Sequence, residues 1–145
     1  MINHGLMTSN TDLWATPQKF FDKYNKEYKF DLDVCATKDN AKCDNYYTID
    51  DDGLDQDWKG TVWMNPPYGR EIGKWMKKAS ESHGIGKAKS IVCLVPSRTD
   101  TKWWHDYAMK GKITFIKGRL KFGNATNSAP FPSAVVVFGK YWRFI

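Results

Sequence analysis

Residues 60–69 read Gly-Thr-Val-Trp-Met-Asn-Pro-Pro-Tyr-Gly, an apolar run that ends in a stiff turn with a polar first residue. The apolar part, residues 61–64, predicts a buried strand. Proline fixes φ and has no N–H, so Asn65 and the carbonyl groups beside it cannot join a helix or a strand ladder. The stretch therefore predicts a strand whose carboxyl end presents fixed hydrogen-bond acceptors beside an aromatic ring. Such a turn suits the binding of a planar amine.

The residues after the turn predict a helix and then a second buried strand. Four apolar residues recur at i, i+3, i+4 and i+7, which places them on one face of a helix. Residues 91–95 read Ile-Val-Cys-Leu-Val and stop at Pro96, a continuous apolar run that is typical of a strand buried on both faces. The apolar helix face consists of Ile72, Trp75, Met76 and Ala79, and Lys74, Lys77 and Lys78 lie off it.

The rest of the chain also alternates between helical and extended patterns. Thr16-Pro17 indicates a helix start, with Thr16 as the N-cap and Pro17 at the first helical position, and the helical aromatic spacing continues to about Lys29. Residues 30–34 alternate with period two, as a strand does. The remaining expected elements are at most one short helix within 36–47, an Asp-rich loop over 50–58, a Gly/Lys loop over 82–89, a helix over 101–109, and strands over 113–116 and 134–138 on either side of a Gly/Asn/Pro-rich stretch, 118–133.

Strands that alternate with helices predict an α/β fold with a mostly parallel sheet and an antiparallel pair at its end. We expect residues 13–145 to form a single domain behind a flexible N-terminus, residues 1–12. Ligands of such sheets bind beyond the carboxyl ends of the strands. Asp33, Asn65 and Arg98 all follow expected strand ends, so we expect them to gather at one edge.

Composition excludes several classes of protein. No apolar run approaches the roughly 20 residues that span a bilayer, and the N-terminus resembles no secretion signal, so we expect a cytoplasmic protein. Cys35, Cys43 and Cys93 lack zinc-type spacing and are expected to be buried, reduced thiols. We expect no metal site.

The net charge of +6 conceals two halves of opposite sign. Residues 1–69 carry 7 Lys and Arg against 12 Asp and Glu, a net charge of −5. Residues 70–145 carry 15 against 4, a net charge of +11. The basic half favours a polyanionic partner such as nucleic acid, although a solvated basic face would have the same composition.

Short motifs that follow one another in the same order along most of the chain resemble the small phage-type DNA N6-adenine methyltransferases, the Dam-like family of phages and prophages. The ordered set is more specific than the four-residue turn by itself. The matching segments are Trp14-Ala15-Thr16-Pro17, Leu32-Asp33-Val34-Cys35-Ala36, Asn40-Ala41-Lys42-Cys43, Asp52-Gly53-Leu54, Asn65-Pro66-Pro67-Tyr68-Gly69, Gly73-Lys74-Trp75, Leu94-Val95-Pro96, Arg98-Thr99-Asp100-Thr101, Gly118-Arg119-Leu120 and Ala134-Val135-Val136-Val137-Phe138.

The resemblance implies a compact Rossmann-like fold and transfer of a methyl group from S-adenosylmethionine to N6 of a flipped-out adenine in double-stranded DNA. Asn65, Pro66, Pro67 and Tyr68 would form the catalytic turn. The Asn65 side-chain oxygen and the Pro66 carbonyl would each accept one N6–H bond, which localises the nitrogen lone pair toward the methyl group. Tyr68 would stack on the flipped base.

The cofactor residues implied by the resemblance are less tightly defined, because the chain has no Gly-x-Gly-x-x-Gly fingerprint. By analogy with related amino-methyltransferases, Asp33 would contact the ammonium group of the cofactor. Thr16 and Pro17 would lie beside the same site. Asp57 or Asp50 would receive the ribose hydroxyls and Trp58 would cover the adenine, although a solvated acidic loop is the more common explanation for any single one of these Asp residues.

The best candidates for DNA contacts lie in the basic half. Arg119 follows Gly118, which would let the backbone approach DNA closely. Trp103 and Trp104 are adjacent on the expected helix, so only one of them can point fully into the core. The predicted DNA-contacting residues are Arg98, Lys102, Arg119 and Lys121, with Lys112 and Lys117 behind them.

Three other functions remain open from the sequence. The same turn serves methyltransferases that act on glutamine side chains, and an RNA adenine methyltransferase would look alike. A third alternative is a catalytically silent DNA-binding protein of the same fold. The target sequence, and the choice between monomer and homodimer, are not encoded in any pattern that we recognise.

Overall fold

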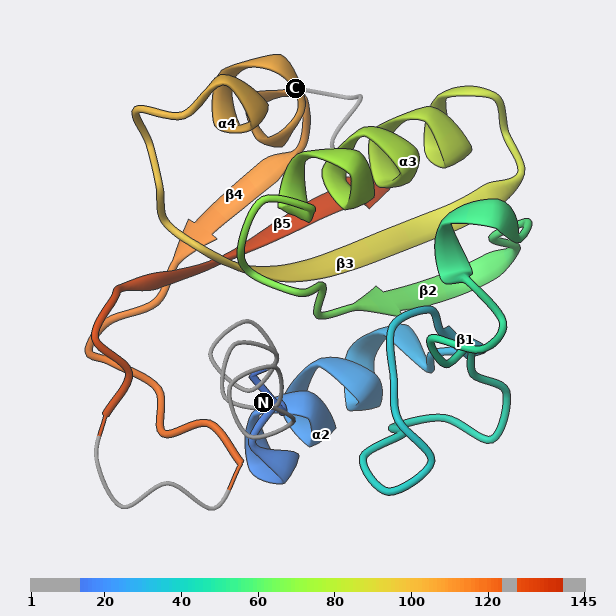
Figure 1. Cartoon of the computed structure of the whole chain (residues 1–145), viewed down its shortest axis with the longest axis horizontal. Helices are drawn as coiled ribbons and strands as arrows, with labels where there is room; N and C mark the ends of the chain where they lie inside the picture. Colours follow the sequence, from blue (N-terminus) through green and yellow to red (C-terminus); the bar gives the residue numbers. More distant parts are fainter. Residues whose placement is uncertain (1–13, 124–127, 140–145) are drawn as a thin grey trace, which may run out of the picture.

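The computed structural model describes residues 14–123 and 128–139, which form an α/β fold around a five-stranded sheet. The strand order is β1-β2-β3-β5-β4 (Figure 1). β1 (Leu32–Asp33), β2 (Gly60–Met64) and β3 (Ala88–Pro96) pair in parallel, and β5 (Ser133–Gly139) pairs antiparallel with both β3 and β4 (Lys112–Phe115). The predicted mostly parallel sheet with an antiparallel pair at its end is confirmed, since only β5 runs against the other strands.

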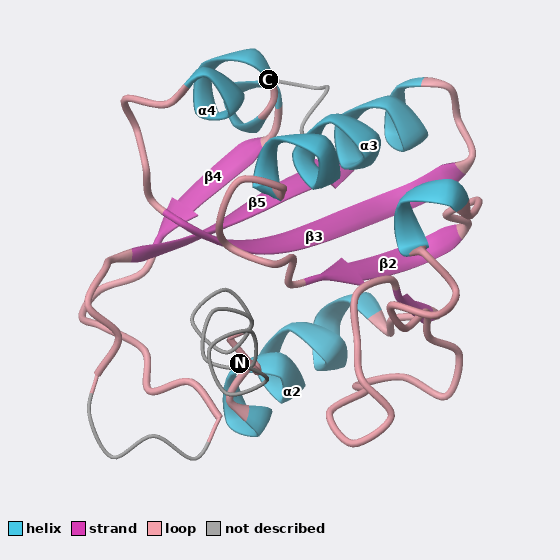
Figure 2. Ribbon diagram, in the orientation of Figure 1, coloured by secondary structure: helices cyan, strands magenta, loops and turns pink. Residues whose placement is uncertain are grey.

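In the described part of the chain, three α-helices accompany the sheet (Figure 2). α2 (Gln18–Tyr28) packs through Phe21 on Trp63 of β2, with the two rings edge to face at 5.1 Å. α3 (Ile72–Gly84) contacts β3 and β5, and α4 (Lys102–Asp106) lies beside α3. The same residues also contain two short 3-10 turns, η1 (Gly53–Asp55) and η2 (Ala108–Lys110).

The helix predicted after the turn is confirmed, and all four of its predicted apolar residues are buried. This helix runs to Gly84, so the expected loop over 82–89 is shorter than predicted. The central strands β2 and β3 are almost fully buried, as their continuous apolar runs indicate.

Several expected elements differ in the structure. Residues 36–47 contain no helix, and the predicted strand over 30–34 is reduced to Leu32–Asp33. The Asp31 and Val34 amides still donate to β2, so the pairing extends beyond the regular strand. The expected helix over 101–109 is divided into α4 and η2. Residues 1–12, expected to be flexible, lie outside the described residues.

The core combines aliphatic side chains with several large aromatic ones. Trp58, Trp63, Met76 and Phe21 are among its largest fully buried side chains. The three cysteines are free, as expected, but only Cys93 is fully buried and the other two are half-buried. Within residues 14–123 and 128–139, every helix is too short or too polar to cross a bilayer. In the same ranges, no group of three or more His, Cys, Asp or Glu side chains is arranged so that it could hold a metal ion.

Candidate functional site

Asn65 follows β2 directly, and the segment before α2 fixes the orientation of its side chain. Its Nδ2 atom donates to the Trp14 carbonyl and to the Thr16 hydroxyl, the latter at 2.9 Å. Both amide hydrogens are thereby used. The Oδ1 atom is buried and has no hydrogen-bond partner among the described residues. Asn65 therefore holds a fixed acceptor whose hydrogen bonding is not completed by the described residues.

This contact also explains why Thr16 does not cap α2. The helix begins at Gln18, Pro17 occupies the N-cap position, and no side chain caps the helix. The expected N-cap role of Thr16 is wrong, because its hydroxyl is buried and accepts the Asn65 amide instead. Pro17 contributes its carbonyl to the first helical turn, where it accepts from the amides of Phe20 and Phe21.

Tyr68, three residues after Asn65, is 3% exposed. Its hydroxyl donates to the Leu94 carbonyl at 3.1 Å, and the edges of Phe122 and Phe131 meet its ring at 6.0 and 5.5 Å. Burial holds the pKa of the phenol well above its usual value, so it stays protonated. The ring has little exposed surface here, and its stacking on a base stays a prediction that requires this aromatic cluster to open.

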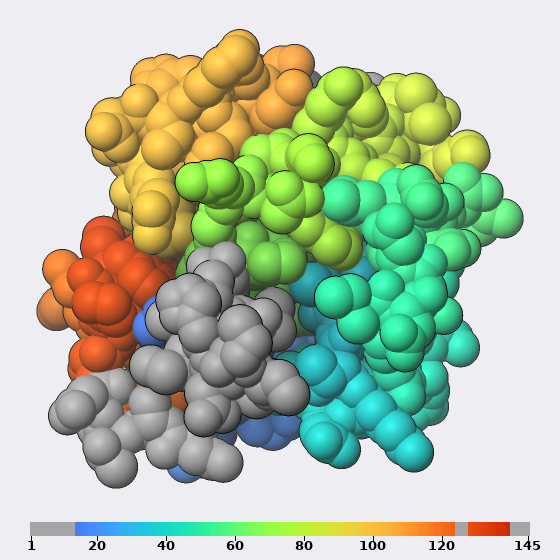
Figure 3. All heavy atoms as spheres, in the orientation of Figure 1, coloured from blue at the N-terminus to red at the C-terminus, as the bar shows by residue number. Residues whose placement is uncertain are grey.

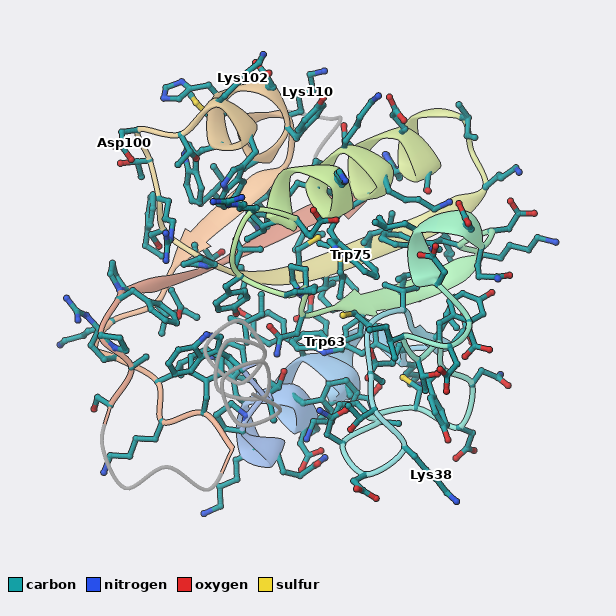
Figure 4. The ribbon with its side chains drawn as sticks, viewed as in Figure 1. Lys38, Trp63, Trp75, Asp100, Lys102 and Lys110 are labelled. Atoms are coloured by element: carbon teal, nitrogen blue, oxygen red, sulfur yellow. The ribbon has the colours of Figure 1, made fainter. Side chains whose placement is uncertain are left out.

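A cavity of about 580 Å³ lies beside the turn, and we call it the Asn65 cavity. It brings together five of the predicted site residues and several residues that the sequence did not single out as site residues. Two of its aromatic lining residues, Trp63 and Trp75, are labelled in Figure 4. The predicted residues that line it are Thr16, Asp33, Asp50, Asn65 and Pro67. The other residues that line it include Trp14, Lys42, Tyr47, Ile49, Trp63 and Trp75.

Asp33 is the most deeply buried charged group of the Asn65 cavity. It is 3% exposed, and its carboxylate accepts the backbone N–H groups of Cys35 at 3.3 Å and Lys42 at 3.0 Å. Burial raises its pKa to about 6, although the two N–H groups and the Lys42 ammonium act in the opposite direction. Asp33 is therefore a carboxylate at neutral pH, held in place by the backbone and facing the cavity.

Trp58 and Asp57 lie outside the Asn65 cavity. Trp58 has no exposed surface, because its N–H donates to the Gly53 carbonyl at 2.8 Å and its ring stacks on Trp75 at 6.0 Å. In this structure Trp58 cannot cover a ligand, contrary to expectation, and Trp75 lines the cavity in its place. Asp57 forms an ion pair with Lys87 at 2.9 Å, so Asp50 alone of the two remains a candidate for ribose hydroxyls.

The predicted DNA-contacting residues divide into two groups. Arg98 and Lys102 line a second cavity of about 670 Å³, between α3 and α4. Arg119 and Lys121 line neither cavity; both are exposed, and Arg119 donates to the Ala129 carbonyl at 3.4 Å.

Gly118 and the Trp103–Trp104 pair lie in the same basic half of the chain. Gly118 has φ +79°, a backbone conformation that favours glycine, and no described atom lies within 4 Å of a Cβ built there. The close approach of its backbone to DNA stays a prediction. Trp104 is buried and Trp103 is half-buried, as their adjacency on a helix predicts.

Comparison with known proteins supplies the family. Residues 4–143 match the family model described as DNA N-6-adenine-methyltransferase (Dam). The chain belongs to this family. A DNA N-6-adenine-methyltransferase of Haemophilus phage HP1 is 34% identical over 143 residues, which cover 90% of this chain and 80% of the relative.

Two further comparisons concern a longer relative and the fold. The DNA N-6-adenine-methyltransferase of Escherichia phage T1 is 29% identical over 74% of this chain, and the match spans 55% of that protein. The crystal structure of the 23S rRNA methyltransferase ErmE superposes with a TM-score of 0.52 at 11% identity, over 86% of this chain and 68% of that one. The fold is thus the Rossmann-like methyltransferase fold that the sequence predicted.

Trp75 and Ile49 show what sequence reasoning missed in the site. The helical spacing predicts that Trp75 lies on the apolar face of α3. In the structure the same side chain packs in the core and also lines the cavity, and the spacing does not indicate this second role. Ile49 is 93% exposed at the cavity, yet it stands alone among polar residues and carries no periodic signal. A single exposed apolar residue is common on any surface and predicts nothing by itself.

Proposed function

We propose that this chain transfers a methyl group from S-adenosylmethionine to N6 of an adenine in DNA. The observation that carries the proposal is the buried, unpartnered Oδ1 atom of Asn65 at the Asn65 cavity. A buried acceptor without a donor costs about 1–3 kcal/mol. Such an atom is expected where a ligand N–H completes the hydrogen bonding, and the exocyclic amine of adenine supplies one.

Asn65 and Pro66 would activate this amine by accepting one hydrogen bond from each of its two N–H groups. The lone pair of N6 is delocalised into the purine ring, so the amine is a poor nucleophile. Two fixed acceptors favour a pyramidal nitrogen and stabilise the positive charge that develops on it as the new bond forms. Asn65 needs no reorganisation to do this, because Trp14 and Thr16 already hold its amide.

The Asn65 cavity fits S-adenosylmethionine in size and in chemistry. A volume of about 580 Å³ lies within the usual range of small-molecule sites. The buried Asp33 carboxylate would hold the ammonium group, Asp50 the ribose hydroxyls, and the aromatic walls, including Trp75, the apolar parts. When bound, the cofactor supplies an electrophilic methyl group on a sulfonium centre. Positioning by these side chains would supply much of the rate, since the amine needs little help from a general base before transfer.

The basic half of the chain and the family membership favour DNA over the glutamine and RNA alternatives. Residues 70–145 carry a net charge of +11, which is the sign that a phosphate backbone requires. Charge does not separate DNA from RNA, so the experiment below includes both nucleic acids.

The direct test is adenine methylation in cells that lack this modification. Cells expressing the wild-type chain should acquire N6-methyladenine at a defined sequence, and cells expressing Asn65→Ala should acquire none. Purified protein with labelled S-adenosylmethionine should label duplex DNA but neither RNA nor a glutamine peptide. Label in RNA or peptide alone would contradict the proposal, and so would binding of DNA without cofactor binding or methylation.

A further inference from the structure

The second cavity, which we call the α3–α4 cleft, is separate from the Asn65 cavity and has no assigned ligand. It has a volume of about 670 Å³ and lies between α3 and α4, which are side by side in the space-filling view (Figure 3). The catalytic turn forms the wall between the two cavities. Asn65 and Pro67 line the Asn65 cavity, whereas Tyr68 and Gly69 line the cleft.

The rim of the cleft is strongly cationic. Five basic side chains line it, and Asp106 is the one carboxylate among its described lining residues. The three lysines have acidic partners: Lys102 pairs with Asp106 at 2.5 Å, Lys74 with Glu71 at 3.3 Å, and Lys77 with Glu81 at 4.0 Å. The remaining two basic residues are Arg70 and Arg98.

Neither Arg70 nor Arg98 has an ion-pair partner among the described residues. Arg70 comes from the turn before α3, and Arg98 follows the end of β3. Guanidinium groups bind phosphate through two parallel N–H bonds. The two arginines therefore offer the cleft a pair of phosphate ligands that the protein itself does not neutralise.

The floor of the cleft is apolar and aromatic. Ile72 and Pro96 line it together with the half-buried rings of Trp103 and Tyr107. Trp103 packs against the core and meets Trp104 in an edge-to-face contact, with ring centroids 5.7 Å apart at 64°. Aromatic side chains beside a cationic rim are the usual means of binding an unpaired nucleotide, with the base on the ring and the phosphate on the rim.

We propose that the α3–α4 cleft binds the DNA nucleotide next to the target adenine. Its phosphate would contact Arg70 and Arg98, and its base would lie against Trp103 and Tyr107. This inference rests on the proposed function for the identity of the strand. An adenine that reaches Asn65 brings its neighbouring nucleotide to the other side of the turn, which is where the cleft opens. The cleft would thus position the strand and read the base beside the target.

The first test is the salt dependence of binding to a fluorescent 20-base-pair duplex. Each phosphate contact that is lost lowers the slope of log affinity against log salt by about 0.9. We expect Arg70→Gln/Arg98→Gln to lower this slope by about two. The matched control is Lys59→Gln/Lys89→Gln, which removes the same charge at the opposite edge of the sheet, where β2 and β3 begin. Equal slopes in the two double variants would overturn the phosphate assignment.

The second test concerns the base. Loss of one stacked base weakens binding by about 5-fold to 150-fold with no change in salt slope. We expect this from Trp103→Leu and, to a smaller extent, from Tyr107→Leu, with thermal melting to confirm that each variant is folded. Unchanged affinity in both folded variants would overturn the base assignment.

The outcomes also separate this inference from the proposed function. Affinity for S-adenosylhomocysteine should be unchanged in all four cleft and control variants. If the wild type methylates DNA while the arginine variant keeps its salt slope, the cleft assignment fails and the proposed function stands. If the arginine variant has the smaller salt slope of DNA affinity but the wild type methylates nothing, the proposed function fails and the cleft remains a DNA site.

Discussion

The Asn65 cavity and the α3–α4 cleft share one wall, yet they differ in charge and in the part of the chain that lines them. The Asn65 cavity is lined by residues 14–67 with Trp75, and it holds the buried Asp33 carboxylate. The cleft is lined by residues 68–107, and its charged side chains are mainly basic. The change from an acidic to a basic sequence near residue 69 thus coincides with the wall itself. In the proposed function, cofactor and DNA would therefore approach the same turn from opposite sides.

The largest expected effect comes from Asn65→Ala, because Asn65 would face the reacting amine in the proposed function. Loss of one fixed dipole of this kind lowers turnover by about 100-fold to 1,000-fold. Calorimetry should show S-adenosylhomocysteine binding within a few-fold of the wild type, and DNA anisotropy should show the same. The exposed Asn45→Ala serves as the control and should leave all three quantities unchanged. If Asn65→Ala abolished the binding of both S-adenosylhomocysteine and DNA, the result would assign the turn a structural role and contradict a catalytic one.

A smaller effect is expected from pH, and it should distinguish the two cavities. The pKa of Asp33 is raised to about 6 by burial, so its carboxylate becomes protonated as pH falls below 6. A neutral carboxyl group attracts an ammonium less, and the affinity for S-adenosylhomocysteine should fall by about tenfold per pH unit below 6. DNA affinity depends on arginines and should not follow this titration. Calorimetry and anisotropy between pH 4.5 and 7.5 measure both.

The same titration has the opposite sign for stability. The folded protein holds the Asp33 proton up to about pH 6, whereas the unfolded chain releases it near its ordinary value of 3.8. The free energy of unfolding of the unliganded protein should therefore decrease as pH rises from about 4 to about 6, by on the order of 3 kcal/mol from this group. Asp33→Asn should lack this component in urea unfolding. An Asp33→Asn protein that kept both pH dependences would contradict the assignment.

The smallest expected effect is that of Tyr68→Phe, which removes one hydroxyl from the wall between the cavities. Loss of the hydrogen bond to the Leu94 carbonyl should lower the free energy of unfolding by about 1 kcal/mol. Turnover should stay near the wild-type value, because the ring remains and the protonated phenol has no role in the transfer. Urea unfolding and a methylation assay check the two quantities. A large loss of turnover in a stable Tyr68→Phe protein would give the hydroxyl a chemical role that the structure does not.

The sheet and the position of the turn could be predicted because both depend on local patterns. The apolar runs predict the strands β2 and β3, and the helical spacing from Ile72 to Ala79 predicts the helix α3. Parallel strands then place Asp33 and Asn65 at one edge without further information. These features follow from the spacing of apolar residues, which can be read from a single sequence.

The parts that could not be predicted depend on contacts between distant segments. Thr16 carries the local signal of an N-cap, but Asn65, 49 residues away, takes its hydroxyl. Trp58 follows the acidic loop and resembles a ligand cover, yet the Gly53 carbonyl and Trp75 bury it. The cleft is missed for the same reason, since Arg70 and Arg98 become neighbours only when α3 and β3 pack together.

The measurement that tests the account most directly is a crossed titration of two variants with two ligands. S-adenosylhomocysteine and a DNA duplex are each titrated at pH 7.5 into the wild type, Asp33→Asn and Arg70→Gln/Arg98→Gln. The account predicts that Asp33→Asn weakens S-adenosylhomocysteine binding by about tenfold or more and leaves DNA binding unchanged, because a hydrogen bond to a charged group is lost. The arginine variant should show the reverse. A variant that weakened both ligands equally, or neither, would contradict the assignment of the two cavities to two ligands.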